Sequence, residues 1–220
     1  MWTKEIVWMI IKGIKDTMYM TLVSTLFGYL LGLPMGITLA VTGKGGIKPN
    51  PVIYKILDFI ANIIRSIPFL ILLILIQPIT ILIVGKSYGA TATIVPLTCA
   101  AAPFIARMVE SSLNEVDKGV IEAAQSMGAD TFTIIWKVLL VEARTSILVG
   151  ATIALGTILG YSAMAGCIGG GGLGDIAIRY GYHRWKADIM FVTVILLIVL
   201  VQIFQTIGMK LSNKIDKRKL

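Results

Sequence analysis

Long apolar runs, separated by short polar segments, dominate the chain. A helix needs about 20 mostly apolar residues to cross the hydrocarbon core of a membrane. The runs are continuous, whereas the strands of a membrane barrel alternate apolar and polar positions. The pattern therefore predicts an all-α polytopic membrane protein, a single transmembrane domain over residues 1–220, with five transmembrane helices near 17–42, 56–85, 88–110, 145–167 and 188–210.

The first fifteen residues differ from these runs because charged and apolar positions are mixed. Such a pattern is typical of an amphipathic helix that lies along a membrane interface. Lys and Arg are distributed unevenly, with 13 in one set of loops and flanks and 7 in the other. Cytoplasmic loops carry the excess of positive charge. We therefore expect the N-terminus outside and, after an odd number of spans, the C-terminus in the cytoplasm.

The second span begins in a segment that carries two charges, Asp58 and Arg65. One interpretation is an ion pair inside the membrane, which would mark a functional site. The other is a protruding turn of helix with charges at the interface, after which Ser66-Ile67-Pro68 starts or kinks the true span. The second interpretation is favoured, because long charged side chains near a helix end reach the interface easily.

Small residues recur every four positions in the first span, at Ser24, Gly28, Gly32, Gly36 and Ala40. Such a stripe lets the backbone of a neighbouring helix approach closely. A similar stripe in the fourth span comprises Thr152, Gly156, Gly160 and Met164. Ordinary close packing of helices in a bundle explains both stripes.

Composition supports the membrane assignment. Hydrophobic residues make up 56% and charged residues 15% of the chain, and the mean hydropathy is +0.86. Soluble domains carry about 25% charged residues, and disordered chains are poor in apolar ones. The net charge of +8 comes from basic residues without interleaved aromatic ones, so no nucleic-acid partner is expected. Cys99, Cys167 and His183 provide no metal-ligand spacing, and no nucleophile and base set for an enzyme is present.

Residues 111–144 are expected to form a cytoplasmic loop. Six of the chain's twelve acidic residues lie between positions 107 and 144. A first short helix has Asp117 as a cap and Gly128 at its end. Its apolar face comprises Val120, Ala124 and Met127.

A second short helix follows, with Asp130 as its cap. Its apolar face comprises Phe132, Ile135, Trp136 and Leu139. Helices that lie on lipid are usually rich in Lys and Arg on the polar face. Because this loop is net acidic, a protein partner is the better interpretation.

Gly169, Gly171 and Gly174 formally match the dinucleotide-binding pattern G-x-G-x-x-G. That pattern binds nucleotide only between a strand and a helix of a βαβ unit. No strand pattern surrounds it here, so it predicts a tight turn where the chain leaves the fourth span at the outer side. Gly85-Lys86-Ser87 lacks the first glycine of a Walker A loop, so no ATP site and no other cofactor is expected in this chain.

The run Glu122-Ala123-Ala124-Gln125-Ser126-Met127-Gly128 resembles the EAA motif of permease subunits in prokaryotic ABC importers. The resemblance implies a coupling helix, 118–128, that docks into a groove of a separate ATPase subunit, which would use the ATP. Val141 stands where the family usually has proline, which bears on the chain turn there. The residues expected to serve the coupling are Val120, Glu122, Ala123, Ala124, Met127 and Gly128.

The stretches 160–166, 169–175 and 179–182 are similar to the methionine-importer permeases. This resemblance implies translocation of methionine, in its D or L form, or of a related amino acid across the prokaryotic plasma (inner) membrane. It further implies a second copy of the chain and an extracytoplasmic substrate-binding lipoprotein as partners, besides membrane lipid.

The fourth span offers candidates for the translocation pathway, at Tyr161, Ser162 and Met164. A thioether substrate is suited to soft apolar walls. Two alternatives stay open, namely an ABC permease for another small substrate and an ion-coupled secondary transporter. The second lacks the ionisable residues that a proton relay needs inside the membrane.

Overall fold

The computed structural model describes residues 3–216, which form helices and no strand. Trp2, Lys217, Arg218 and Lys219, which contributed to the predictions above, lie outside this range. The longer helices are α1 (Lys4–Thr42), α2 (Pro51–Ser66), α5 (Ala90–Asn114), α9 (Arg144–Ala165) and α11 (Ala187–Ile215). The shorter α-helices are α3 (Phe69–Leu75), α4 (Gln77–Val84), α6 (Lys118–Ser126), α7 (Thr131–Thr133), α8 (Leu140–Glu142) and α10 (Gly172–Ile176). Two π-helical segments, η1 (Ile134–Leu139) and η3 (Ala177–Tyr182), and a 3-10 turn, η2 (Gly166–Ile168), complete the order.

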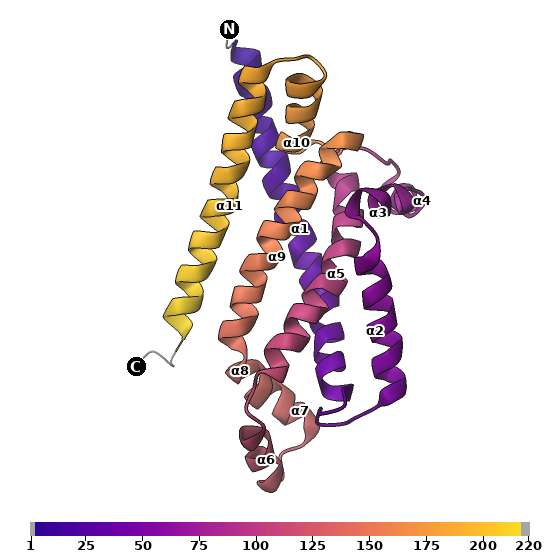
Figure 1. The fold of residues 1–220 in the computed structure, drawn as a ribbon, viewed down its shortest axis with the longest axis vertical. Coiled ribbons are helices and arrows are strands. Elements are labelled where there is room, and N and C mark those ends of the chain that lie inside the picture. The colour runs from indigo at the N-terminus through magenta and orange to yellow at the C-terminus, as the bar shows by residue number, and fades with distance from the viewer. Residues whose placement is uncertain (1–2, 217–220) are drawn as a thin grey trace.

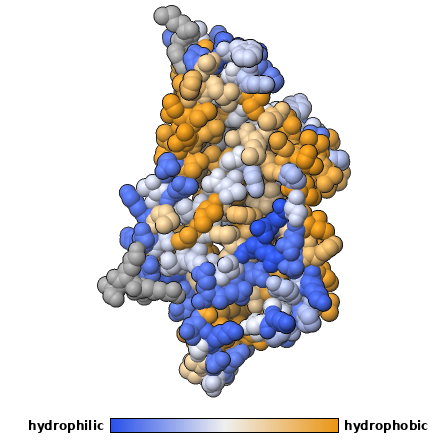
Figure 2. Space-filling view, viewed as in Figure 1, coloured by the Kyte–Doolittle hydropathy of each residue, from blue (hydrophilic) through white to orange (hydrophobic). Residues whose placement is uncertain are grey.

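The long helices run between two ends of the molecule (Figure 1). Four described helices are long and apolar enough to cross a membrane, and there are five spans if the bent pair α2–α3 counts as one. The N-terminal end of α1 lies at the end of the molecule opposite α6 (Figure 1). Hydrophobic side chains cover the upper part of α11 and the region of α3 and α4, and hydrophilic ones gather toward the α6 end (Figure 2). The all-helical membrane architecture is thus confirmed, with four or five candidate spans among the described residues.

The N-terminal segment differs from its prediction. No separate interfacial helix forms, because residues from Lys4 onward are the first turns of the continuous helix α1. The Thr3 side chain caps this helix by accepting the Ile6 backbone N–H. No proline stands near residue 15 to end a helix there, so the apolar run continues the helix that begins at Lys4.

The second span is not one helix over 56–85 but a broken one. α2 and α3 are bent by 104° at the break, and α4 follows as a third piece. Pro68 has no N–H to donate, and Ile67 before it is extended at φ −81° and ψ 124°. The kink predicted at Ser66–Pro68 is present, and the predicted span 56–85 is divided among three helices.

The small-residue stripe of α1 packs closely against α5. A side chain at Gly32 would begin 2.5 Å from the Ala102 carbonyl oxygen of α5. One at Gly36 would begin 2.5 Å from the Ala106 carbonyl oxygen, one turn further along. The stripe predicted from sequence therefore packs directly on the α5 backbone.

The glycine-rich segment after α9 makes the predicted tight turn. Gly169, Gly171 and Gly172 have φ near +80°, a left-handed conformation that favours glycine. The Leu173 N–H donates to the Thr17 hydroxyl over 2.9 Å, which fixes α10 against α1. The turn places α10 beside the N-terminal half of α1 (Figure 1), and η3 packs against α11.

Candidate functional site

Helix α6 projects at one end of the molecule, between α5 and α9 in the chain (Figure 1). The Asp117 carboxylate accepts the Gly119 N–H over 2.6 Å and caps its first turn. At the other end Gly128 has φ +80°, and the Ala129 N–H donates to the Ala124 carbonyl oxygen over 3.1 Å. Both end signals read from the sequence are confirmed, so α6 is a rigid element with defined ends.

The predicted apolar face of α6 is split between two environments. Val120 and Met127 are 42% and 81% exposed, whereas Ala124 is 5% exposed and belongs to the core of this chain. Glu122 and Ala123 are exposed as well. Ala124 therefore holds α6 against the chain itself and offers no surface to a partner. We call Val120, Glu122, Ala123 and Met127, with the corner at Gly128, the coupling surface.

The predicted apolar face of the second short helix of the loop is also split between buried and exposed positions. Ile134 and Leu139 are buried, while Phe132 and Trp136 are exposed with their ring centroids 5.9 Å apart. The π-helical segment η1 shifts the register within the turn, so the face predicted for an α-helix does not persist. The chain stays helical through Val141 in α8 and breaks only at Ala143 before α9.

Asp130 caps this second piece by accepting the Phe132 N–H over 3.2 Å. A hydrogen bond from the Thr133 side chain, with further backbone N–H bonds, holds the pKa of Asp130 below its ordinary value. A lowered folded-state pKa means that the cap contributes fully above the unfolded-state pKa of about 3.9. Its contribution is then lost as the pH falls through the lowered value.

We expect Asp130→Ala to loosen the start of this segment at neutral pH, because the Phe132 N–H loses its acceptor. Hydrogen exchange at the Phe132 amide should be faster in Asp130→Ala than in the natural chain. Asp130→Ser, which keeps a capping oxygen, is the matched control and should stay close to the natural rate. Equal rates in Asp130→Ala and the natural chain would contradict the capping role.

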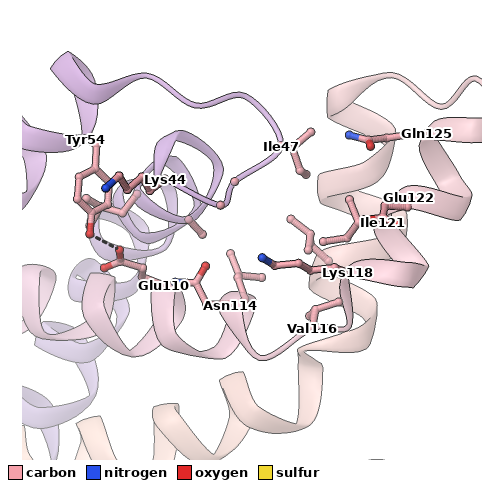
Figure 3. Close-up of a pocket in the computed structure, with 17 residues that line it drawn as sticks. Lys44, Ile47, Tyr54, Glu110, Asn114, Val116, Lys118, Ile121, Glu122 and Gln125 are labelled. Atoms are coloured by element: carbon pink, nitrogen blue, oxygen red, sulfur yellow. Dashed lines mark hydrogen bonds between the residues drawn. The ribbon is translucent and has the colours of Figure 1, made fainter.

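A cavity of about 430 Å³ separates α6 from the ends of α1 and α5 (Figure 3). Lys118 of α6 and Lys44 of the loop after α1 extend toward it, as drawn in Figure 3. At its inner end the Tyr54 hydroxyl donates to the Glu110 carboxylate over 3.2 Å. Polar groups of α2, α5 and the loop after α1 therefore face α6 across this cavity.

Arg107 of α5 links this cavity wall to α2. Its guanidinium donates to Asp58, to the Glu110 carboxylate over 2.7 Å and to the Asn62 side chain over 3.0 Å. The partner of Asp58 is thus on another helix, and no ion pair with Arg65 forms among the described residues. The charged start of the second span therefore serves as an interhelical clamp between α2 and α5.

We expect Arg107→Met to destabilise the folded chain by about 3 kcal/mol, the lower end for breaking a buried ion pair, because Asp58 is 33% exposed. The loss arises mainly because Glu110, which is buried, keeps its charge without the guanidinium. A lower thermal midpoint in nanodiscs would report it. Arg65→Met, at an exposed arginine, is the matched control, and an equal midpoint for the two variants would contradict the clamp.

The three predicted pathway residues occupy different environments. The Tyr161 ring stacks on Phe69 of α3 with centroids 4.5 Å apart. Met164 is exposed on α9, but Ser162 is 1% exposed and donates to the Leu159 carbonyl oxygen of its own helix. Ser162 therefore lines no path in this structure, because its hydroxyl is enclosed and already satisfied.

Residues 32–217 match the family model described as "Binding-protein-dependent transport system inner membrane component". The chain belongs to this family. It is therefore an inner-membrane transport component rather than an enzyme.

Relatives within this family match nearly the whole chain. A probable D-methionine transport system permease protein MetI of Vibrio cholerae is 53% identical over 92% of this chain and 90% of the relative. The D-methionine transport system permease protein MetI of Escherichia coli K12 is 49% identical over 74% of this chain and 76% of its own length.

Solved structures agree on the fold. A chain of the MetNI methionine ABC transporter, in an inward-facing conformation, aligns with a TM-score of 0.96 and 45% identity over 98% of this chain and 100% of that one. A chain of an amino acid ABC transporter crystallised with histidines aligns with a TM-score of 0.74 at 21% identity, over 98% and 96% of the two chains. The second likeness concerns the fold alone.

The sequence predicts α6 and its caps but not the clamp around Arg107. Glu110 counts there only among the acids between positions 107 and 144, and Tyr54 carries no signal of its own. The sequence signal for this clamp is that Arg107, Glu110 and Asp58 lie near the ends of two apolar segments. Pairing them required the antiparallel placement of α2 against α5, which the sequence alone does not give.

Proposed function

We propose that the chain is the transmembrane permease subunit of an ATP-driven ABC importer that translocates methionine, in its D or L form, or a related amino acid. The observation that carries this proposal is the alignment over 98% of this chain, at 45% identity, with a chain of the MetNI methionine ABC transporter. The name of the Vibrio cholerae relative supports the same substrate. ATP is bound and hydrolysed by a separate ATPase subunit, and this chain holds no cofactor.

The coupling surface is the docking element for that ATPase subunit. Exposed Met127 and Val120 supply apolar contacts, and Glu122 beside them supplies a charge. Interface cores of this kind combine apolar anchors with few charges. Closure of two ATPases on ATP would carry both coupling helices and rotate the spans as rigid bodies, opening the path outward.

Two copies of the chain form the transmembrane pathway. Five passes give only one wall, and the exposed side of α9 carries apolar residues such as Ile153 and Met164. The N-terminus lies outside and the C-terminus in the cytoplasm, as the distribution of basic residues favours. This orientation puts α6 on the cytoplasmic side, where the ATPase is. A substrate-binding lipoprotein delivers the amino acid to the opposite face.

Reconstitution tests the proposal. The chain is inserted into proteoliposomes with its ATPase subunit, and the substrate-binding lipoprotein and radiolabelled methionine are added on the extracytoplasmic side. Uptake that requires internal ATP and the binding protein is the expected result. Uptake that runs on an ion gradient without ATP would overturn the importer and favour an ion-coupled secondary transporter. ATP-driven uptake of another small solute, with none of methionine, would reject the substrate alone.

A further inference from the structure

A second cavity, here called the outer pocket, lies at the end of the molecule opposite α6. It has a volume of about 440 Å³, within the range of pockets that hold small ligands. Its walls come from the first half of α1, the start of α5, the glycine turn and α10–η3. The coupling surface does not extend to it, so the function proposed above leaves this pocket unused.

Asp16 is the unexplained group in this pocket. It is half-buried on α1, at the point where the helix becomes continuously apolar. Among the described residues it makes no hydrogen bond and no ion pair, although Lys12 stands one helical turn earlier. By contrast, Asp58 and Asp175 each pair with an arginine. A carboxylate that lines a pocket and has no partner on the protein is available to receive a cation.

The glycine turn keeps the space in front of Asp16 open. A side chain at Gly171 would begin 3.9 Å from the Asp16 carboxylate oxygen and 3.5 Å from the Ala90 backbone nitrogen. Gly171 also has φ +82°, so a side chain there is disfavoured by backbone conformation. The turn itself is held in place because the Gly89 N–H donates to the Gly169 carbonyl oxygen over 2.9 Å. The G-x-G-x-x-G pattern therefore shapes a pocket wall.

The remaining lining suits the rest of a free amino acid. Lys12 and Arg179 supply positive charge for a carboxylate, and Arg179 is half-exposed despite its pair with Asp175. Met9 and Ile176 add apolar surface beside the polar groups. Both charge signs next to an apolar wall are the complement of a zwitterion with an apolar side chain, and polarizable groups accept a thioether.

We propose that the outer pocket binds a free zwitterionic α-amino acid, with Asp16 receiving its α-ammonium group and Lys12 and Arg179 its α-carboxylate. This proposal rests on the importer function, in which a binding protein releases such a substrate at this end of the molecule. The pocket then holds the amino acid at the outer side before it passes between the helices.

Direct binding to the full-length chain in nanodiscs, without ATPase or binding protein, tests the proposal. Radiolabelled methionine is the probe, and N-acetylmethionine, which lacks the ammonium group, competes with it. We expect the natural chain to prefer methionine by about tenfold or more, the usual effect of losing a hydrogen-bonded charge. In Asp16→Asn, methionine should bind about tenfold more weakly and N-acetylmethionine as before, so the preference disappears.

Matched controls lie on the same helix. Glu5→Gln removes an acidic residue of α1 that lies outside the pocket, and it is compared with Asp16→Asn. Lys15→Gln removes a lysine of α1 that lies outside the pocket, and it is compared with Lys12→Gln. The two control variants should keep the natural affinity, and Lys12→Gln should weaken methionine but not methioninamide. Loss of affinity in Glu5→Gln equal to that in Asp16→Asn would overturn the assignment.

The natural chain decides the matter even where a variant does not fold. Absence of saturable methionine binding, or equal affinity for methionine, N-acetylmethionine and methioninamide, would overturn the outer pocket as a zwitterion site. ATP-driven methionine uptake by the complete importer is measured in parallel. Uptake without such binding rejects the pocket and leaves the proposed function intact. Binding without uptake supports the pocket and counts against the importer.

Discussion

Replacing Gly32 by alanine is expected to prevent stable assembly of the helix bundle. The added methyl group would start 2.5 Å from the Ala102 carbonyl oxygen and 2.9 Å from the Ile105 Cβ atom. Both atoms belong to the framework of α5, so neither can move aside as the end of a flexible side chain does. Helices α1 and α5 would have to separate along their whole contact. The resulting loss of stability is expected to exceed that of ordinary overpacking in a core, about 1–3 kcal/mol.

The yield of monodisperse protein after solubilisation, and its thermal midpoint, measure this effect. Gly150→Ala is the matched control, because it is also a buried helical glycine. A methyl group there would meet only the flexible Met108 side chain, at 3.4 Å. The control should stay within about 0.5 kcal/mol of the natural stability, as for substitutions without a clash. If both variants behaved alike, the close approach of α1 and α5 would not be essential.

Reversal of the charge at Glu122 should uncouple the permease from its ATPase. Glu122 is exposed on α6 and makes no ion pair within the described residues, so Glu122→Lys leaves the fold of the chain unchanged. In the proposed complex the same position faces the ATPase subunit. Disturbing a charged contact in such an interface costs about 2–5 kcal/mol, or about 30-fold or more in affinity.

Affinity of the ATPase for the permease in nanodiscs, together with methionine transported per ATP hydrolysed, measures the effect of Glu122→Lys. Glu142→Lys is the matched control, because Glu142 is an exposed acid of the same loop that lies on α8. The control should retain natural affinity and coupling. Unchanged ATPase affinity in Glu122→Lys would remove Glu122 from the docking role, while an equal loss in both variants would indicate a general charge effect.

Local patterns in the chain were sufficient for much of the architecture. Continuous apolar runs require helices in a membrane, because every backbone polar group must be satisfied within its own segment. The caps of α6, Asp117 and Gly128, act over a few residues, so they could be predicted directly from the sequence. The stripe of small residues around Gly32 could also be predicted, because residues three to four positions apart lie on the same face of a helix.

Long-range contacts decided what those patterns left open. Helical periodicity placed Ala124 on one apolar face of α6 with Val120 and Met127, but Ala124 is buried in the core of the chain itself. Periodicity shows which residues share a face and not what that face contacts. The pairing of Asp58 with Arg107 depends on which two helices lie side by side, 49 positions apart in the chain. The bend after α2, the burial of Ser162 and the space between Asp16 and Gly171 likewise arise from helices that meet only in the folded bundle.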